Sequence, residues 1–159
     1  KTVPTVTVEQ AGAQSDPVNV LPILFDVLFS EAVTGFDATD VTMGGTATGV
    51  TFDVTGSGTT FTIQINGITG DGTTVPTIAS GRATDSANNG NQAATSADNS
   101  VTYDSTPPQV ASISRADTNP TNASSVDYTV TFSEPVTGVT SGERVHGHGR
   151  RHVAAGPGG

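Results

Sequence analysis

The side chains with the clearest chemical potential in this 159-residue sequence are carboxylates and amides that lie in its turns. Calcium takes six to eight oxygen ligands of this kind. The expected strand order gathers these turns at the two ends of a sandwich and at a junction with a second unit. The candidate ligands at one end are Glu31, Asp85, Asn88 and Asp98, with Asn89 and Asn91 in the same loop, and those at the other end and the junction are Asp16, Asp71, Asp104 and Glu134.

The calcium hypothesis competes with an ordinary structural role for the same side chains. None of the clusters has the spacing of an EF-hand loop. Asp and Asn in turns often accept hydrogen bonds from nearby backbone N–H groups. Glu31 and Glu134 occupy matching positions in two similar segments. They could serve as ligands at the junction, or as turn carboxylates that accept backbone N–H bonds. The sequence leaves both interpretations open.

Residues 1–140 contain neither His nor Cys, which excludes a Ser-His-Asp arrangement or a thiol nucleophile there. Paired carboxylates of the glycosidase type remain conceivable, but the acids are spread nearly evenly along the chain. The sequence therefore predicts a protein that is not an enzyme. The alternative is a ligand-binding module for a glycan or a protein partner that uses the loop 85–98. With two Tyr and no Trp, stacking platforms for sugars are scarce.

Composition indicates an all-β chain, because β-branched residues dominate and the sequence holds 27 Thr and 19 Val. The absence of Cys excludes a disulfide scaffold. All fifteen acids lie within residues 1–143, where Lys1, Arg82 and Arg115 are the only Lys or Arg residues. Such an acidic body is a poor nucleic-acid binder. The longest apolar run, residues 21–29, is too short for a membrane span and contains Asp26.

The sequence also repeats itself at an offset of 103 residues. Residues 29–35 read Phe-Ser-Glu-Ala-Val-Thr-Gly, and residues 132–138 read Phe-Ser-Glu-Pro-Val-Thr-Gly. The same offset aligns Phe25 with Tyr128 and Val27 with Val130. We therefore expect one complete domain over 1–104, a Pro-rich linker over 105–108, and the first third of a second copy over 107–140.

Apolar residues alternate with polar ones in Ile23–Phe29, Val126–Phe132 and Phe61–Ile65, as in half-buried strands. Gly-rich and Asn-rich turns separate the segments. The predicted strands of the first copy are residues 3–9, 19–30, 37–44, 49–55, 59–66, 75–84 and 99–104. The second copy has only two strands and an apolar row, so we expect it to fray, to pack on the first domain, or to associate with another chain by edge addition.

The segments 29–35 and 132–138, together with 68–73, 83–91 and 103–108, resemble the signature of bacterial immunoglobulin-like repeats. The resemblance implies an immunoglobulin-like Greek-key β-sandwich of about seven strands, followed by an incomplete copy. It also implies a secreted or cell-surface protein with a spacer or adhesive role, whose partners are neighbouring repeats. Some relatives bind calcium at domain junctions.

Residues 141–159 depart from the repeat, since Thr disappears and Gly, Arg and His appear. His146, His148 and His152 could share a transition-metal ion, but the Gly-rich context favours a disordered basic tail. Codons can be chosen for residues 141–152 such that a shift of the reading frame by one base yields a sequence like the third strand of the repeat. We hypothesise that the tail is a frameshifted reading of the repeat, which its coding DNA would test.

Overall fold

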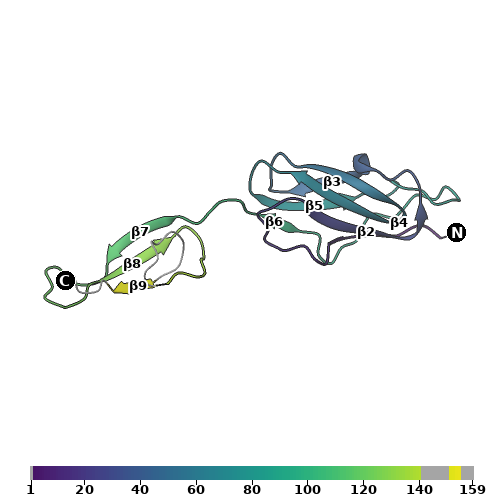
Figure 1. The fold of residues 1–159 in the computed structure, drawn as a ribbon. Helices are drawn as coiled ribbons and strands as arrows, with labels where there is room; N and C mark the ends of the chain where they lie inside the picture. The colour runs from purple at the N-terminus through teal and green to yellow at the C-terminus, as the bar shows by residue number, and fades with distance from the viewer. Residues whose placement is uncertain (1, 141–150, 155–159) are drawn as a thin grey trace. The chain divides into compact units, whose positions relative to one another are not determined.

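The computed structural model describes residues 2–140 and the backbone of 151–154. The chain forms two compact units, Lys1–Ser105 and Thr106–Gly159, shown in Figure 1. The described residues are all-β, in small antiparallel sheets of three strands each. Their one helical element is a short 3-10 turn, η1 (Ala38–Asp40). No helix in the described part of the chain is long and apolar enough to cross a membrane.

Unit 1 is built from two antiparallel sheets. The strands of the first sheet, in spatial order, are β1 (Val6–Gln10), β2 (Ile23–Val33) and β4 (Thr51–Gly67). Those of the second sheet are β3 (Val41–Gly45), β5 (Gly72–Ile78) and β6 (Val101–Tyr103). One hydrophobic core takes side chains from both sheets, so the sheets form two layers.

The core follows the alternation seen in the sequence. Ile23, Phe25, Val27 and Phe29 of β2 are all at most 2% exposed. The rings of Phe29, Phe36 and Phe61 meet edge to face, with centroids 5.0–5.7 Å apart. The period-2 prediction for β2 and for residues 61–65 is therefore confirmed.

Strand β4 folds back on itself as a hairpin. Asn66 donates from Nδ2 to Asp53 Oδ2 over 2.9 Å, although the two residues are 13 positions apart. The reversal occurs at Gly56 and Gly58, whose φ angles of 124° and 69° suit glycine. A Cβ at Gly56 would lie 2.6 Å from the Cα atom of Phe61. The two predicted strands 49–55 and 59–66 are the two arms of this hairpin.

Several predicted strand boundaries are wrong. Residues 79–84 do not continue β5, because the chain turns at Ser80 and Gly81 and enters a long loop that ends before β6. Residues 38–40 form η1 instead of a strand, since Asp37 caps the turn by accepting from Thr39 N. Strand β2 begins later than predicted and continues to Val33, so Glu31 lies in the strand and not after it.

Unit 2 contains β7 (Val110–Arg115), β8 (Asp127–Phe132) and β9 (Arg151–Ala154), in that order across one antiparallel sheet. Strand β8 is the counterpart of β2. Gly138 has φ 78° and its counterpart Gly35 has φ 80°, so the repeated segment ends in the same left-handed backbone conformation. The expectation of a disordered tail falls largely outside the described residues, but 151–154 form β9 against β8.

Candidate functional site

The first and last segments of unit 1 lie parallel to each other. We call residues 6–18 and 94–104 the terminal pair. Thr95 donates its amide to the Val6 carbonyl over 3.0 Å and accepts from the Val8 amide over 3.2 Å. Further along, Val18 donates to the Thr102 carbonyl and accepts from the Asp104 amide, each over 2.9 Å. These are the two parallel bridges Thr7↔Thr95 and Val18↔Tyr103, in a unit whose sheets are otherwise antiparallel.

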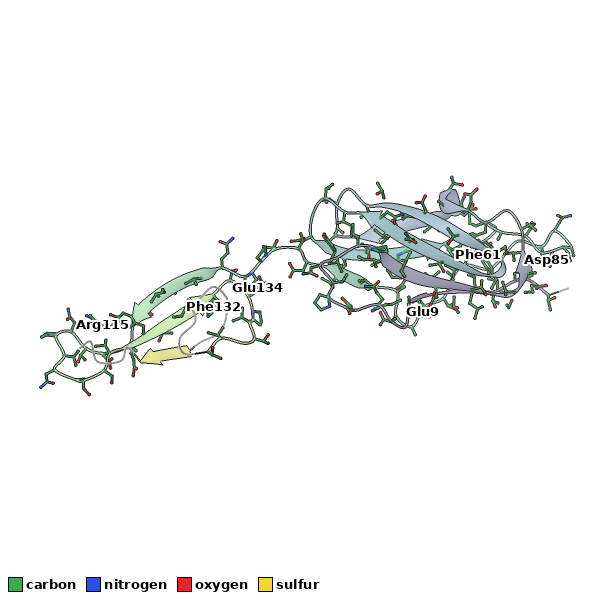
Figure 2. All side chains as sticks on the ribbon, viewed as in Figure 1. Glu9, Phe61, Asp85, Arg115, Phe132 and Glu134 are labelled. Atoms are coloured by element: carbon green, nitrogen blue, oxygen red, sulfur yellow. The ribbon has the colours of Figure 1, made fainter. Side chains whose placement is uncertain are left out.

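A side chain strengthens the first half of the terminal pair. The Glu9 carboxylate, on β1, accepts from the Ala97 amide at 2.9 Å and from the Asp98 amide at 2.7 Å. The Gln10 amide also donates to the Asp98 carbonyl at 2.7 Å. The backbone bonds from Ala97 and then Asp98 lower the pKa of Glu9 below its ordinary value of 4.5. Figure 2 labels Glu9 on unit 1.

Two predicted calcium ligands hold the second half of the terminal pair and the chain that follows it. Asp16 Oδ1 accepts from the Thr102 amide at 2.9 Å. Asp71 Oδ1 accepts from both the amide and the hydroxyl of Ser105, at 2.9 and 2.8 Å. Asp104, with Pro17, Val18 and Asn19, lines a groove of about 330 Å³. These carboxylates fix the point at which the chain leaves unit 1.

The long loop between β5 and β6 is held by buried polar side chains. Asp85 and Asn89 are 6% and 7% exposed, and Asp85 Oδ1 accepts from the amides of Ala87 and Asn89, each at 2.8 Å. Asn89 Nδ2 reaches Asp85 Oδ2 at 2.5 Å and the Thr2 carbonyl at 3.2 Å. Figure 2 places Asp85 at the end of unit 1 that carries the N-terminus.

Asn91 is the centre of the same loop. It is 2% exposed, and its Oδ1 accepts from the amides of Arg82 and Ala83 at 2.7 and 2.8 Å. Its Nδ2 donates to the carbonyls of Ala79 and Gln92 at 3.1 and 2.6 Å. The Asn91 side chain therefore supplies hydrogen bonds to backbone groups that no longer pair in a sheet once β5 has ended at Ile78.

The predicted ligand set is dispersed over these places. Asp85 and Asn88 share one turn, in which Asn88 has φ 58°. The backbone amide of Asp98 donates to Glu9, and Glu31 lies within β2. Glu134 follows β8 in unit 2, and its Oε1 atom is buried and has no hydrogen-bond partner. Within residues 2–140, no three acidic or histidine side chains lie close enough to hold one metal ion. Asp85 accepts from backbone amides two and four residues away, as a turn-capping side chain does. Asp16 and Asp71 instead bond backbone amides that are 86 and 34 positions away along the chain.

His146 and His148 lie outside the described residues, and only the backbone of His152 is described, in β9. Sequence reasoning missed Glu9 and Thr102. A charged residue inside the alternating segment Val6–Gln10 was a signal for Glu9, but its partners are 88 and 89 residues away along the chain.

We compared the chain with models of protein families, with curated proteins and with solved structures, and none of the three comparisons finds a match.

Proposed function

We propose that this chain is a non-catalytic, force-bearing spacer: an immunoglobulin-like repeat, with part of a second, from a secreted or cell-surface protein. The observation that carries the proposal is the parallel terminal pair of unit 1. A spacer transmits tension from one end of each domain to the other. The contact that joins the first and last segments of the domain therefore decides its resistance.

The terminal pair would be loaded in shear. Its two segments run in the same direction, so the N-terminus and the exit toward unit 2 lie at opposite ends of unit 1 (Figure 1). Tension applied at the two ends slides residues 6–18 along residues 94–104. The hydrogen bonds of both parallel bridges and of Glu9 then carry the load together. In a pair pulled from one end, they would break one after another.

The strand order supports the immunoglobulin-like assignment. With the arms of β4 counted separately, the first sheet has the order β1, β2, 59–67, 51–55, and the second has β3, β5, β6. Constant-type immunoglobulin domains arrange strands A, B, E, D in one sheet and C, F, G in the other. The chain crosses between the sheets from β2 to β3, from β3 to β4 and from β4 to β5, as in a Greek-key sandwich.

The repeat supports a role in a tandem array. The repeated segments 29–35 and 132–138 both end in a glycine with the same left-handed conformation, although residues 29–33 lie within β2 and only Phe132 of the second segment lies in β8. Neighbouring repeats are then the partners of each unit, and adhesion is the cellular process such an array would serve. We also propose that the loop carboxylates bind calcium. A bound cation would reduce the electrostatic repulsion among the acidic side chains where the chain leaves unit 1.

Single-molecule stretching of the full chain tests the proposal. The chain contains no Cys, so thiol handles at Thr2→Cys and Pro107→Cys are unique. We expect unit 1 to unfold in one step that releases about 350–380 Å of extended chain, less the length of the folded unit. Gradual lengthening without a force peak would contradict a force-bearing role.

A further inference from the structure

Two asparagines of unit 1 are each followed directly by glycine, and an Asn-Gly pair is a labile point in a protein chain. The two pairs in this sequence are Asn66-Gly67 and Asn89-Gly90. The backbone nitrogen of the glycine can attack the side-chain carbonyl carbon of the asparagine, because glycine has no Cβ that would hinder the approach. Both pairs carry the same intrinsic reactivity, so their surroundings in the fold decide which of them reacts.

The fold protects Asn89. This residue is 7% exposed, and its Nδ2 atom donates to Asp85 Oδ2 and to the Thr2 carbonyl. The Asn89 carbonyl accepts from the Asp85 amide at 3.1 Å, and the Asn89 amide donates back to Asp85 Oδ1 at 2.8 Å. Closing a ring onto the nitrogen of Gly90 would rotate the Asn89 side chain and break buried hydrogen bonds, which is costly.

Asn66 lies in a more open place. It is exposed, and the pairing of β4 with β2 ends at Ile65, one residue before it. Its side chain is held only at the surface: Gln64 Nε2 donates to Asn66 Oδ1 at 2.8 Å, and Asn66 Nδ2 donates to Asp53 Oδ2 at 2.9 Å. Such exposed hydrogen bonds contribute little net stability, since water competes for the same groups. Water also reaches this site, and the later step of the reaction requires it.

We propose that Asn66 is a self-modifying site, at which the folded chain converts asparagine to aspartate or isoaspartate without an enzyme. The Gly67 nitrogen forms a bond to Asn66 Cγ, the bond from Cγ to Nδ2 breaks, and the proton of the Gly67 amide leaves with the side-chain nitrogen as ammonia. Water then opens the resulting cyclic imide. Attack of water on the side-chain carbonyl gives aspartate, and attack on the backbone carbonyl gives isoaspartate. No oxidant or reductant takes part.

The reaction changes a contact between the two arms of the β4 hairpin. After it, a carboxylate stands where the Asn66 amide donated to Asp53, so two negative charges face each other. Like charges that face each other across antiparallel strands are destabilising. Isoaspartate also lengthens the backbone of β4 by one atom and so disturbs the pleat. The site therefore weakens unit 1 slowly, at a rate that the chain itself sets.

Incubation of the full chain at mildly alkaline pH, in buffer and in guanidinium chloride, tests this proposal by peptide mapping. Trypsin cleaves after Arg82, so Asn66 and Asn89 fall on different peptides, and mass spectrometry locates the residue that has exchanged its amide for an acid. We expect modification at Asn66 but not at Asn89 in buffer, and at both in denaturant. The proposal is overturned if Asn89 reacts as fast as Asn66 in buffer, or if Asn66 stays intact there while the denatured chain reacts.

Variants test the consequence separately. Asn66→Asp, which is the aspartate product, should lower the melting temperature of unit 1 by a few degrees. The loss should shrink when Asp53→Asn removes the facing charge. Asn66→Gln is the matched control, because it keeps an amide but would have to close a larger ring, so it should abolish the modification. An equal loss with and without Asp53→Asn, or no loss in either, contradicts the weakening by charge.

Discussion

Replacing Val18 with proline should weaken the mechanical resistance of unit 1 by removing one hydrogen bond from the terminal pair. Proline has no amide proton, so the 2.9 Å bond from Val18 to the Thr102 carbonyl is lost. The Val18 carbonyl still accepts from Asp104. The change therefore removes half of the Val18↔Tyr103 bridge, and it also replaces one partly buried side chain that packs against the core while leaving the fully buried core residues unchanged.

The size of the effect follows from the environment of the bond. A net hydrogen bond contributes about 1 kcal/mol, and a partly buried carbonyl left without a donor adds about 1 kcal/mol more. Thr102 and Val18 are both half-buried, so we expect a loss of about 2 kcal/mol. If the bond is intact in the folded state and broken in the transition state for unfolding under tension, unfolding accelerates by up to about 30-fold.

A constant-force stretching experiment between handles at residues 2 and 107 measures this rate. Asn19→Pro is the matched control, because the Asn19 amide donates no hydrogen bond in the described structure and its side chain is exposed. It introduces the same residue one position later and should leave the rate nearly unchanged. Equal unfolding rates for Val18→Pro and Asn19→Pro would refute the reasoning.

The other predictions concern thermal stability, pH and calcium. Asn91→Ala leaves one buried amide, one part-buried amide and two part-buried carbonyls without their Asn91 partner, so it should destabilise unit 1 by about 2–4 kcal/mol and lower its melting temperature by roughly 10–20 °C. The folded-state pKa of Glu9 is lowered, so its contribution to stability is present above pH 4.5 and is lost as the pH falls through that lowered pKa. Glu9→Gln should flatten the acid side of the stability profile measured by urea unfolding, and an acid side as steep as that of the wild type would contradict this. If calcium binds unit 1, hundredfold excess over its Kd should raise stability by about 2.7 kcal/mol relative to chelator; an unchanged melting temperature would reject that proposal.

Local sequence patterns were sufficient to predict most strands. The alternation of Ile23, Phe25, Val27 and Phe29 predicts a strand with one buried face, and the structure buries all four. Gly56-Ser57-Gly58 predicts the reversal between two strands, and β4 turns there. In both cases the determining interactions lie within a few residues, where side-chain periodicity and backbone freedom act directly.

Other features depend on residues that are distant in sequence. The end of β5 at Ile78 depends on Asn91, which supplies hydrogen bonds to Arg82 and Ala83 from 8 or 9 positions away. The terminal pair joins Glu9 to Asp98, and Asp16 to Thr102, across 86–89 positions. The sequence marks Asp16 and Asp98 as chemically interesting but does not say that backbone amides are their partners. A single carboxylate in a turn has the same appearance whether it caps a backbone or binds an ion.

The most direct test of the force-bearing role compares two directions of pulling on unit 1. Handles at Thr2→Cys and Pro107→Cys load the terminal pair in shear. Handles at Val20→Cys and Pro107→Cys pull on the ends of its two segments that lie together, and so peel the Val18↔Tyr103 bridge open. Val20 is 64% exposed, which suits a handle. We predict a clearly higher unfolding force in the first direction. Equal forces in the two directions would contradict a mechanical role for the terminal pair.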